Sequence, residues 1–119
     1  IDYMNNKPGI YSARLAKKHG SFLNAMKFIL KKMKNVKNRK ATFVCSLSYK
    51  KFNGEVISVE GKLRGNISSK ILGKKGFGYD PIFIPINKKI TFGQMTKSKK
   101  IKMDHRFLAF KKLKKKIKI

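Results

Sequence analysis

A glycine-rich segment at residues 76–80 contains the residue types that point most directly to chemistry. It places the aromatic rings of Phe77 and Tyr79 among two glycines and ends on Asp80. The glycines allow positive φ angles and a close approach of the backbone to a ligand. The rings can stack on a base, and the loop amides can bond to a base edge or an anion. A tight strand connection with its aromatic rings in the core would explain the same residues.

A second group of polar side chains lies nearer the C-terminus and consists of Lys100, His105 and Arg106. We expect Asp104 to cap a helix that begins with His105 and Arg106. Backbone N–H groups and two side chains then converge in the first helical turn. Such an arrangement favours binding of an anion or a carbonyl oxygen. The alternative is a surface histidine beside one more of the 31 basic residues.

The positive charge of the chain favours binding to polyanions but does not identify a particular one. Lys plus Arg number 31 against 5 Asp plus Glu, so the formal net charge is +26, and nearly all the basic residues are Lys. Because Arg fits phosphates and base edges better than Lys, we interpret most of the lysines as a solvated surface of biased composition. Nucleic-acid binding is expected to be at most non-specific. Five acidic residues leave little material for a site with several carboxylates.

Length and composition limit the class of protein. The 119 residues, of which 41% are hydrophobic, suit a single domain over residues 1–119 with a modest core. No apolar run approaches the roughly 18 residues of a membrane-spanning helix, so no membrane partner is expected. The single Cys45 cannot form an internal disulfide, and we interpret it as a structural thiol. A cytoplasmic location is therefore the default.

Hydrophobic periodicity predicts the elements that position these residues. Residues 21–34 fit a helix with Ser21 as N-cap, and residues 41–64 fit two antiparallel strands joined at Asn53-Gly54. A short strand is expected at residues 82–86, and a second amphipathic helix after Asp104. The apolar face of that helix is expected to hold Phe107, Phe110, Leu113 and Ile117.

Taken together, the motifs follow an order that resembles the inosine triphosphate pyrophosphatase family, the noncanonical purine nucleoside triphosphate pyrophosphatases. The motifs are PGIYSAR at residues 8–14, GFGYDPIF at residues 76–83, Thr91-Phe92, and Lys100 with His105-Arg106. This combination is highly specific, and the resemblance runs over nearly the whole chain.

The resemblance implies an enzyme that hydrolyses dITP, ITP and XTP to the monophosphate and pyrophosphate, which removes deaminated purines from the nucleotide pool. It implies Mg²⁺ as cofactor, a homodimer, and a mixed-sheet α/β fold with the active cleft between two lobes. A donor facing the purine 6-oxo group would meet another donor in the amino group of adenine, which disfavours ATP. The residues that the resemblance assigns to substrate binding are Phe77, Gly78, Tyr79, Asp80, Lys100, His105 and Arg106, with Phe77 as the stacking ring.

Departures from the family pattern limit what the chain is expected to do alone. Asp104 stands where the family usually has Ser, and a carboxylate there weakens binding of an anionic substrate. The catalytic Asp of the family, the Mg²⁺-binding acids and the N-terminal nucleotide loop are expected upstream of Ile1. We therefore interpret the chain as the C-terminal portion of the domain, inactive alone, with no catalytic or metal-binding residue of its own. The alternative is a small basic protein that binds nucleic acid non-specifically.

Overall fold

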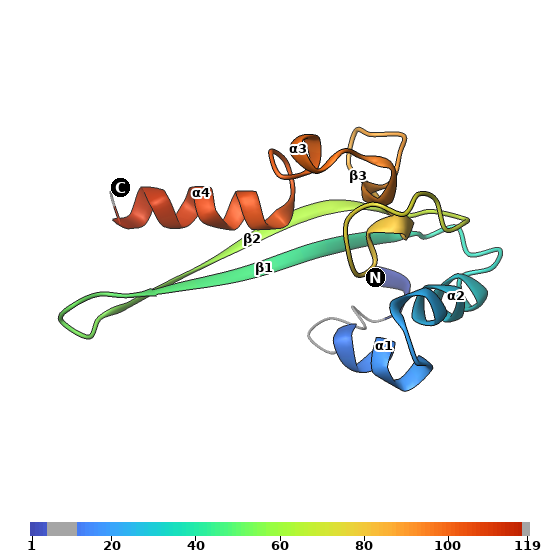
Figure 1. Cartoon of the computed structure of the whole chain (residues 1–119), viewed down its shortest axis with the longest axis horizontal. Helices are drawn as coiled ribbons and strands as arrows, with labels where there is room; N and C mark the ends of the chain where they lie inside the picture. The colour runs from blue at the N-terminus through green and yellow to red at the C-terminus, as the bar shows by residue number, and fades with distance from the viewer. Residues whose placement is uncertain (5–11, 118–119) are drawn as a thin grey trace.

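The chain folds around a long β-hairpin flanked by helices (Figure 1). The structure, a computed structural model, describes residues 1–4 and 12–117. The helices are α1 (Ser12–His19), α2 (Phe22–Lys32), α3 (Lys97–Lys100) and α4 (His105–Ile117). The strands are β1 (Lys40–Lys50), β2 (Val56–Ile67) and β3 (Phe83–Pro85). Single 3-10 turns lie at Asp2–Met4, Asp80–Ile82 and Phe92–Gln94.

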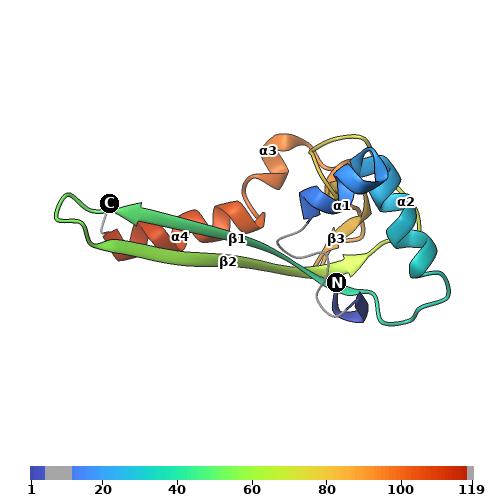
Figure 2. The same cartoon turned by 90° about the horizontal axis from the view of Figure 1, so that it is seen from below.

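The described strands form one antiparallel sheet in the order β1-β2-β3. Strands β1 and β2 pair along their whole length, with Cys45 opposite Gly61, and β3 adds to the end of β2. In Figures 1 and 2 the hairpin projects as an arm with α4 running along it, whereas α1 and α2 lie at the opposite end of the hairpin from its loop. The α/β fold class expected from the sequence is confirmed.

The predicted hairpin and the first predicted helix are both present. The Ser21 Oγ accepts a hydrogen bond from the backbone N–H of Asn24 at 3.0 Å, so Ser21 caps α2 as expected. At the hairpin tip Gly54 has a φ of +88°, a conformation that L side chains rarely adopt. Its N–H donates to the carbonyl of Lys51 at 3.0 Å, which closes the turn. Cys45 is half-buried on β1.

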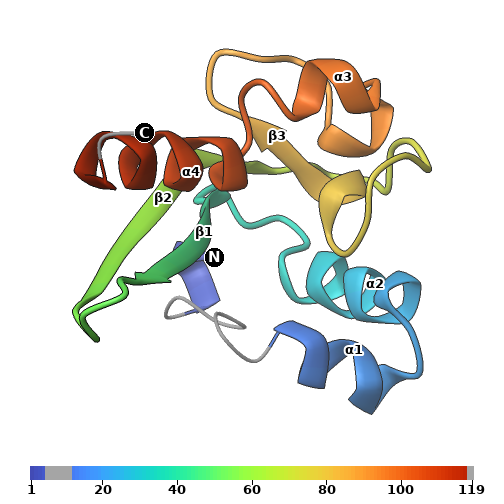
Figure 3. The same ribbon diagram turned by 60° about the vertical axis from the view of Figure 1, so that its left-hand side comes forward.

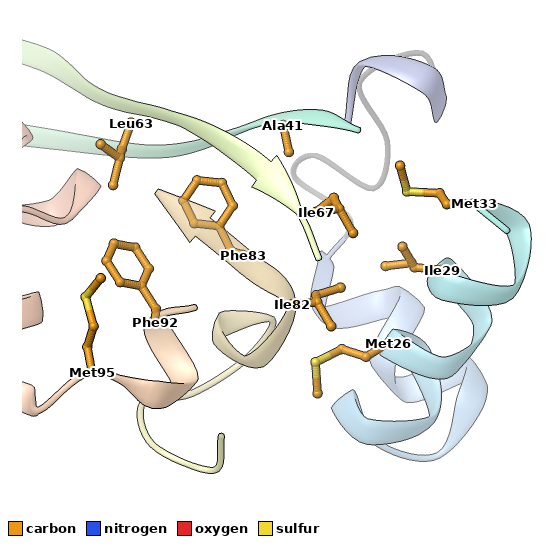
Figure 4. Packing of buried hydrophobic residues seen from close by; sticks show 10 residues of the cluster. All are labelled: Met26, Ile29, Met33, Ala41, Leu63, Ile67, Ile82, Phe83, Phe92 and Met95. Atoms are coloured by element: carbon orange, nitrogen blue, oxygen red, sulfur yellow. The ribbon is translucent and has the colours of Figure 1, made fainter. Parts of the chain in front are cut away.

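The core forms where α2 meets the base of the hairpin. Figure 4 shows side chains of α2 pointing toward Ile67 and Ile82, with Phe83 and Phe92 beside them. The rings of Phe43 and Phe83 stack with centroids 3.9 Å apart, which extends the core onto the hairpin. The buried cluster consists of Met26, Ile29, Met33, Ala41, Leu63, Ile67, Ile82, Phe83, Phe92 and Met95.

Helix α4 follows Asp104 as predicted, but the predicted apolar face is wrong in part. Phe107 and Phe110 are 38% and 58% exposed, whereas Ala109 and Leu113 are buried. The reason is close packing at Gly61, where an added Cβ would lie 2.2 Å from the Ala109 backbone nitrogen. A small residue therefore faces the sheet. Among the described residues no helix combines the length and the apolar character needed to cross a membrane.

Candidate functional site

Most of the predicted site residues line one groove. A hollow of about 830 Å³ lies between the N-terminal end of α2, the base of the hairpin, the glycine-rich loop and the start of α4. Figure 3 shows the chain just before β3 lying against α2. The predicted residues that line the groove are Phe77, Gly78, Tyr79, Asp80, His105 and Arg106. Lys100 is the exception, and it reaches the others through Asp80.

The glycine-rich loop has the positive φ angles that its sequence suggested. Gly76 and Gly78 have φ values of +74° and +62°. An added Cβ at Gly76 would lie 2.1 Å from Oδ2 of Asp80, so any larger residue would collide with that carboxylate. The Phe77 side chain is 53% exposed at the groove, so the interpretation that both rings belong to the core is wrong for Phe77. Tyr79 is half-buried, edge-on to Phe22 with centroids 5.1 Å apart.

Asp80 and Lys100 form a buried ion pair beneath this loop. Oδ2 of Asp80 lies 2.6 Å from Nζ of Lys100 and accepts a second hydrogen bond, of 3.0 Å, from the backbone N–H of Phe77. The two side chains are 3% and 6% exposed. The ion pair therefore joins the loop to the end of α3, although the residues are 20 positions apart in the sequence.

Two cations lie against the Phe77 ring. Nζ of Lys100 is 4.1 Å from the ring centroid, and Cζ of Arg106 is 4.2 Å from it. Cations at these distances are attracted by the electron-rich face of an aromatic ring. Arg106 is exposed, whereas Lys100 is buried. This end of the groove is both aromatic and positively charged.

His105 is held at the first residue of α4. Oδ1 of Asp104 accepts a hydrogen bond from the Phe107 N–H at 2.8 Å, which fixes the start of the helix as predicted. The imidazole packs edge-on to the Phe43 ring, with centroids 5.0 Å apart. Burial lowers the pKa of His105, and the positive charge of Arg106 acts in the same direction, whereas Asp104 opposes it. The pKa shift favours a neutral imidazole near neutral pH.

The orientation of His105 leaves one ring nitrogen inside the protein. Its Nδ1 is buried and has no hydrogen-bond partner among the described residues. A neutral imidazole carries one donor and one acceptor nitrogen. The other nitrogen, Nε2, is thus the one that can serve a ligand in the groove.

Sequence reasoning missed two cations of the groove, Lys62 and Arg64 of β2. They are two residues apart, so a strand places them on the same face. The sequence pattern does not predict that this face lines the groove. The Thr91-Phe92 motif is fully buried and belongs to the core instead of the groove. Of the PGIYSAR motif, residues 8–11 lie outside the described residues, and the remainder begins α1.

The described acidic residues do not form a metal site. Within residues 1–4 and 12–117 no three His, Cys, Asp or Glu side chains come together in a way that could hold a metal ion. Asp80 is engaged by Lys100, and Asp104 caps α4. Glu55 and Glu60 pair with lysines on the hairpin arm, each at 3.6 Å.

The fold and groove define an α/β protein whose site offers an exposed aromatic ring beside cationic donors, which suits a flat, anionic ligand. A model of the Ham1 family matches residues 1–116, and the chain belongs to that family. It is 44% identical over 116 residues to the dITP/XTP pyrophosphatase of Clostridium perfringens, a match that covers 96% of this chain and 57% of that protein. The family resemblance inferred from the motifs is thereby confirmed.

Solved structures agree with the sequence relatives. The Ham1 protein of Staphylococcus aureus has a TM-score of 0.89 at 34% identity, over 98% of this chain and 60% of that one. The nucleoside-triphosphatase, dITP/XTP pyrophosphatase, of Mycobacterium abscessus has a TM-score of 0.79 at 33% identity, over 94% of this chain and 58% of that one. The chain thus spans little more than half the length of these relatives.

Proposed function

We propose that this chain supplies the base-recognition half of an enzyme that hydrolyses dITP, ITP and XTP to the monophosphate and pyrophosphate. The observation that carries the proposal is the half-exposed Phe77 ring at the groove, with Arg106 4.2 Å from its centroid and His105 among the lining residues. Relatives named dITP/XTP pyrophosphatase, which match nearly the whole of this chain, support the choice of substrate.

The proposed recognition of the base uses donors that adenine cannot satisfy. Phe77 stacks on the purine, and Arg106, which has donors only, faces the 6-oxo group of hypoxanthine or xanthine. Nε2 of His105 offers a second polar contact. Adenine has an amino group at the same position, so the Arg106 donors would face another donor. Such an unpaired contact disfavours ATP strongly. The remaining predicted contacts, through Gly78, Tyr79, Asp80 and Lys100, are part of the same proposal.

The proposal assigns base binding to the described residues and neither metal binding nor proton transfer. Mg²⁺, which the resemblance implies, would neutralise charge on the phosphates during hydrolysis. The described carboxylates do not fit that role, because four of the five are engaged elsewhere and only Asp2 and Asp80 line the groove. The proposal names no catalytic Asp among them.

Nucleotide binding by the purified 119-residue chain tests the proposal. We expect ITP to bind at least about tenfold more tightly than ATP, since one charge-assisted hydrogen bond is worth about 1.5–3 kcal/mol. Calorimetry would measure the affinities, and amide chemical shifts of residues 76–80 would locate the ligand. Pyrophosphate release from ITP with ample Mg²⁺ should stay at background. Equal affinity for ITP and ATP, with shifts elsewhere, would contradict the proposal.

The assembly and location of the protein are further proposals that follow from the resemblance. We propose a homodimer in the cytoplasm, where the nucleotide pool lies, and light scattering on the purified chain would measure the oligomeric state. The rival function, a small nucleic-acid-binding protein, finds no support among the relatives, which are named as pyrophosphatases or Ham1 proteins.

A further inference from the structure

We propose that Phe22 is a positioning residue that holds the Tyr79 ring at the groove, so that the start of α2 fixes one aromatic wall of the base site. The inference rests on the proposed function for the identity of the ligand and adds a residue to it. Phe22 lies outside the motifs on which the family resemblance depends.

The first argument is the contact between the two rings. Phe22 and Tyr79 meet edge to face, with centroids 5.1 Å apart and an angle of 84° between the ring planes. Aromatic pairs prefer this arrangement, because the positive edge of one ring faces the negative face of the other. An added Cβ at Gly78 would lie 3.8 Å from Cε1 of Phe22. Phe22 is therefore next to the glycine-rich loop at two consecutive residues.

The second argument is the direction in which α2 presents Phe22. Phe22, Met26, Ile29 and Met33 follow the spacing of one helical face, and the last three are buried in the core. Phe22 is the first residue of the helix, and it is 39% exposed and lines the groove. The face that anchors α2 in the core therefore continues into the groove through Phe22.

The third argument is the fixed start of α2. Gly20 has a φ of +89°, which favours glycine and turns the chain between α1 and α2. Ser21 caps the helix, and the side-chain amide of Asn24 donates to the carbonyl of His19 at 2.9 Å. These contacts hold the backbone on both sides of Phe22. A ring that is held in place before the base arrives avoids the entropy cost of ordering it on binding.

The surroundings of Tyr79 agree with this contact. Its ring is half-buried, and burial raises the pKa of its hydroxyl above the usual 10. The hydroxyl is therefore protonated near neutral pH and can donate or accept a hydrogen bond. Loss of the Phe22 ring would expose Tyr79 and leave its side chain free to adopt other rotamers.

A residue that acts only through Tyr79 has a distinctive mutational signature. Once Tyr79 has been replaced, the further loss of Phe22 should have little effect, because the effects of two residues in contact are not additive. A ring that contacts the nucleotide itself would change the affinity by the same factor whether or not Tyr79 is present.

The experiment compares Phe22→Ala, Tyr79→Ala and the double variant with the wild-type 119-residue chain. Leu23→Ala is the matched control, since Leu23 is an exposed apolar residue at the next position of α2 and does not line the groove. Calorimetry measures the affinities for ITP and ATP. NMR without nucleotide measures the chemical shifts of the Tyr79 ring protons, which depend on the neighbouring ring. Melting curves show that each variant is folded.

We expect Phe22→Ala to lose about fivefold in ITP affinity and to move the Tyr79 ring signals toward those of an exposed tyrosine. In the Tyr79→Ala background, the loss of Phe22 should change the affinity by less than about twofold. Leu23→Ala should match the wild type. Phe22→Leu keeps an apolar side chain but has no aromatic edge, so it should show the same pattern with little change in melting temperature.

Two results would overturn the inference. An equal loss of ITP affinity on removal of Phe22 in both backgrounds would show that Phe22 contacts the nucleotide directly. Unchanged Tyr79 ring signals in Phe22→Ala and Phe22→Leu would show that Phe22 does not hold the ring.

The failure of the proposed function can be told apart from the failure of this inference. A wild-type chain that does not prefer ITP to ATP contradicts the proposed function. The Tyr79 ring signals, measured without nucleotide, still decide whether Phe22 positions the ring.

Discussion

Arg106 and His105 are neighbours at the start of α4, but their side chains lie in different surroundings. Arg106 is exposed and lies against the Phe77 ring, whereas His105 is half-buried against Phe43. The capping carboxylate of Asp104, which is 4% exposed, is turned to the Phe107 N–H. The Asp104 carboxylate therefore caps the helix, and its expected effect on substrate binding stays a prediction.

The exposed position of Arg106 leads to the first prediction. Arg106→Ala should lower the preference for ITP over ATP by about tenfold or more, because a charge-assisted hydrogen bond to the 6-oxo group is lost. The melting temperature should change little, since the side chain is not part of the core. Calorimetric titration of each nucleotide measures the preference.

The control for this prediction is Arg106→Lys, which keeps the charge but loses the planar fork of donors. We expect it to fall between the wild type and Arg106→Ala in base preference. An unchanged ITP preference in Arg106→Ala would show that another residue reads the base.

The second prediction concerns the pH dependence of stability. Burial, the largest cause, lowers the pKa of His105 from its usual 6.5. The unfolded chain therefore binds a proton at this residue more readily than the folded chain. The contribution of His105 to stability is present above pH 6.5 and is lost as the pH falls from there through the folded pKa.

Urea unfolding between about pH 7.5 and about pH 5.5 checks this prediction, since the interval brackets the ordinary histidine pKa. We expect the midpoint of the wild type to fall as the pH drops, and His105→Gln to show a smaller fall. Equal pH dependence in the two proteins would mean that other groups cause the change.

At the scale of elements, the close approach of α4 to the hairpin places His105 and Arg106 at the groove. The contact depends on Gly61, because an added Cβ would lie 2.2 Å from both the Ala109 nitrogen and the His105 carbonyl oxygen. Neither backbone atom can move without shifting the whole helix. The spacing of α4 from the sheet is therefore set by one glycine.

The third prediction is that Gly61→Ala destabilises the chain by about 1–3 kcal/mol, the usual cost of forcing extra volume into a packed site. It should also weaken ITP binding, since the start of α4 moves with the helix. Gly54→Asn is the matched control, because no atom lies within 4 Å of its Cβ site and Asn tolerates positive φ better than most residues. If Gly61→Ala is as stable as the control, the packing contact does not limit α4.

Considered as a whole, the molecule is elongated, with extents of 51 × 28 × 24 Å, and strongly basic. The hairpin arm accounts for much of that length in Figure 1. That residues 1–119 form a single domain remains a prediction, and coincident unfolding curves from two spectroscopic probes would check it.

The fourth prediction concerns the net charge of +26. Binding to DNA or RNA should be independent of sequence and should weaken steeply between about 50 and about 200 mM salt, because lysines that neutralise phosphates release counterions. Fluorescence anisotropy with two unrelated oligonucleotides measures both properties. Tight, sequence-selective binding that persists at high salt would support the nucleic-acid-binding alternative.

The sequence by itself determined the elements and the motif residues of this protein. Caps, turns and hydrophobic spacing depend on residues a few positions apart, so Ser21, Asp104 and Gly54 could be recognised directly. The glycine-rich loop could be recognised for the same reason, because its positive φ angles follow from residue type. The order of these motifs was also enough to indicate the family, which the relatives confirm.

Only the tertiary structure decided which of these residues meet, since contacts over long sequence separations depend on how the elements pack. The buried ion pair of Lys100 with Asp80 could not be predicted from the sequence, and Phe107 and Phe110 looked buried but are exposed. Arg39 is another residue whose contacts the sequence could not predict. Its guanidinium donates to the carbonyls of Met33, Ile67 and Ser68 and joins the ends of α2 and β2. A periodic pattern predicts which residues share one face of a helix or strand. Which other part of the chain packs against that face depends on the volume and charge of side chains that are distant in the sequence.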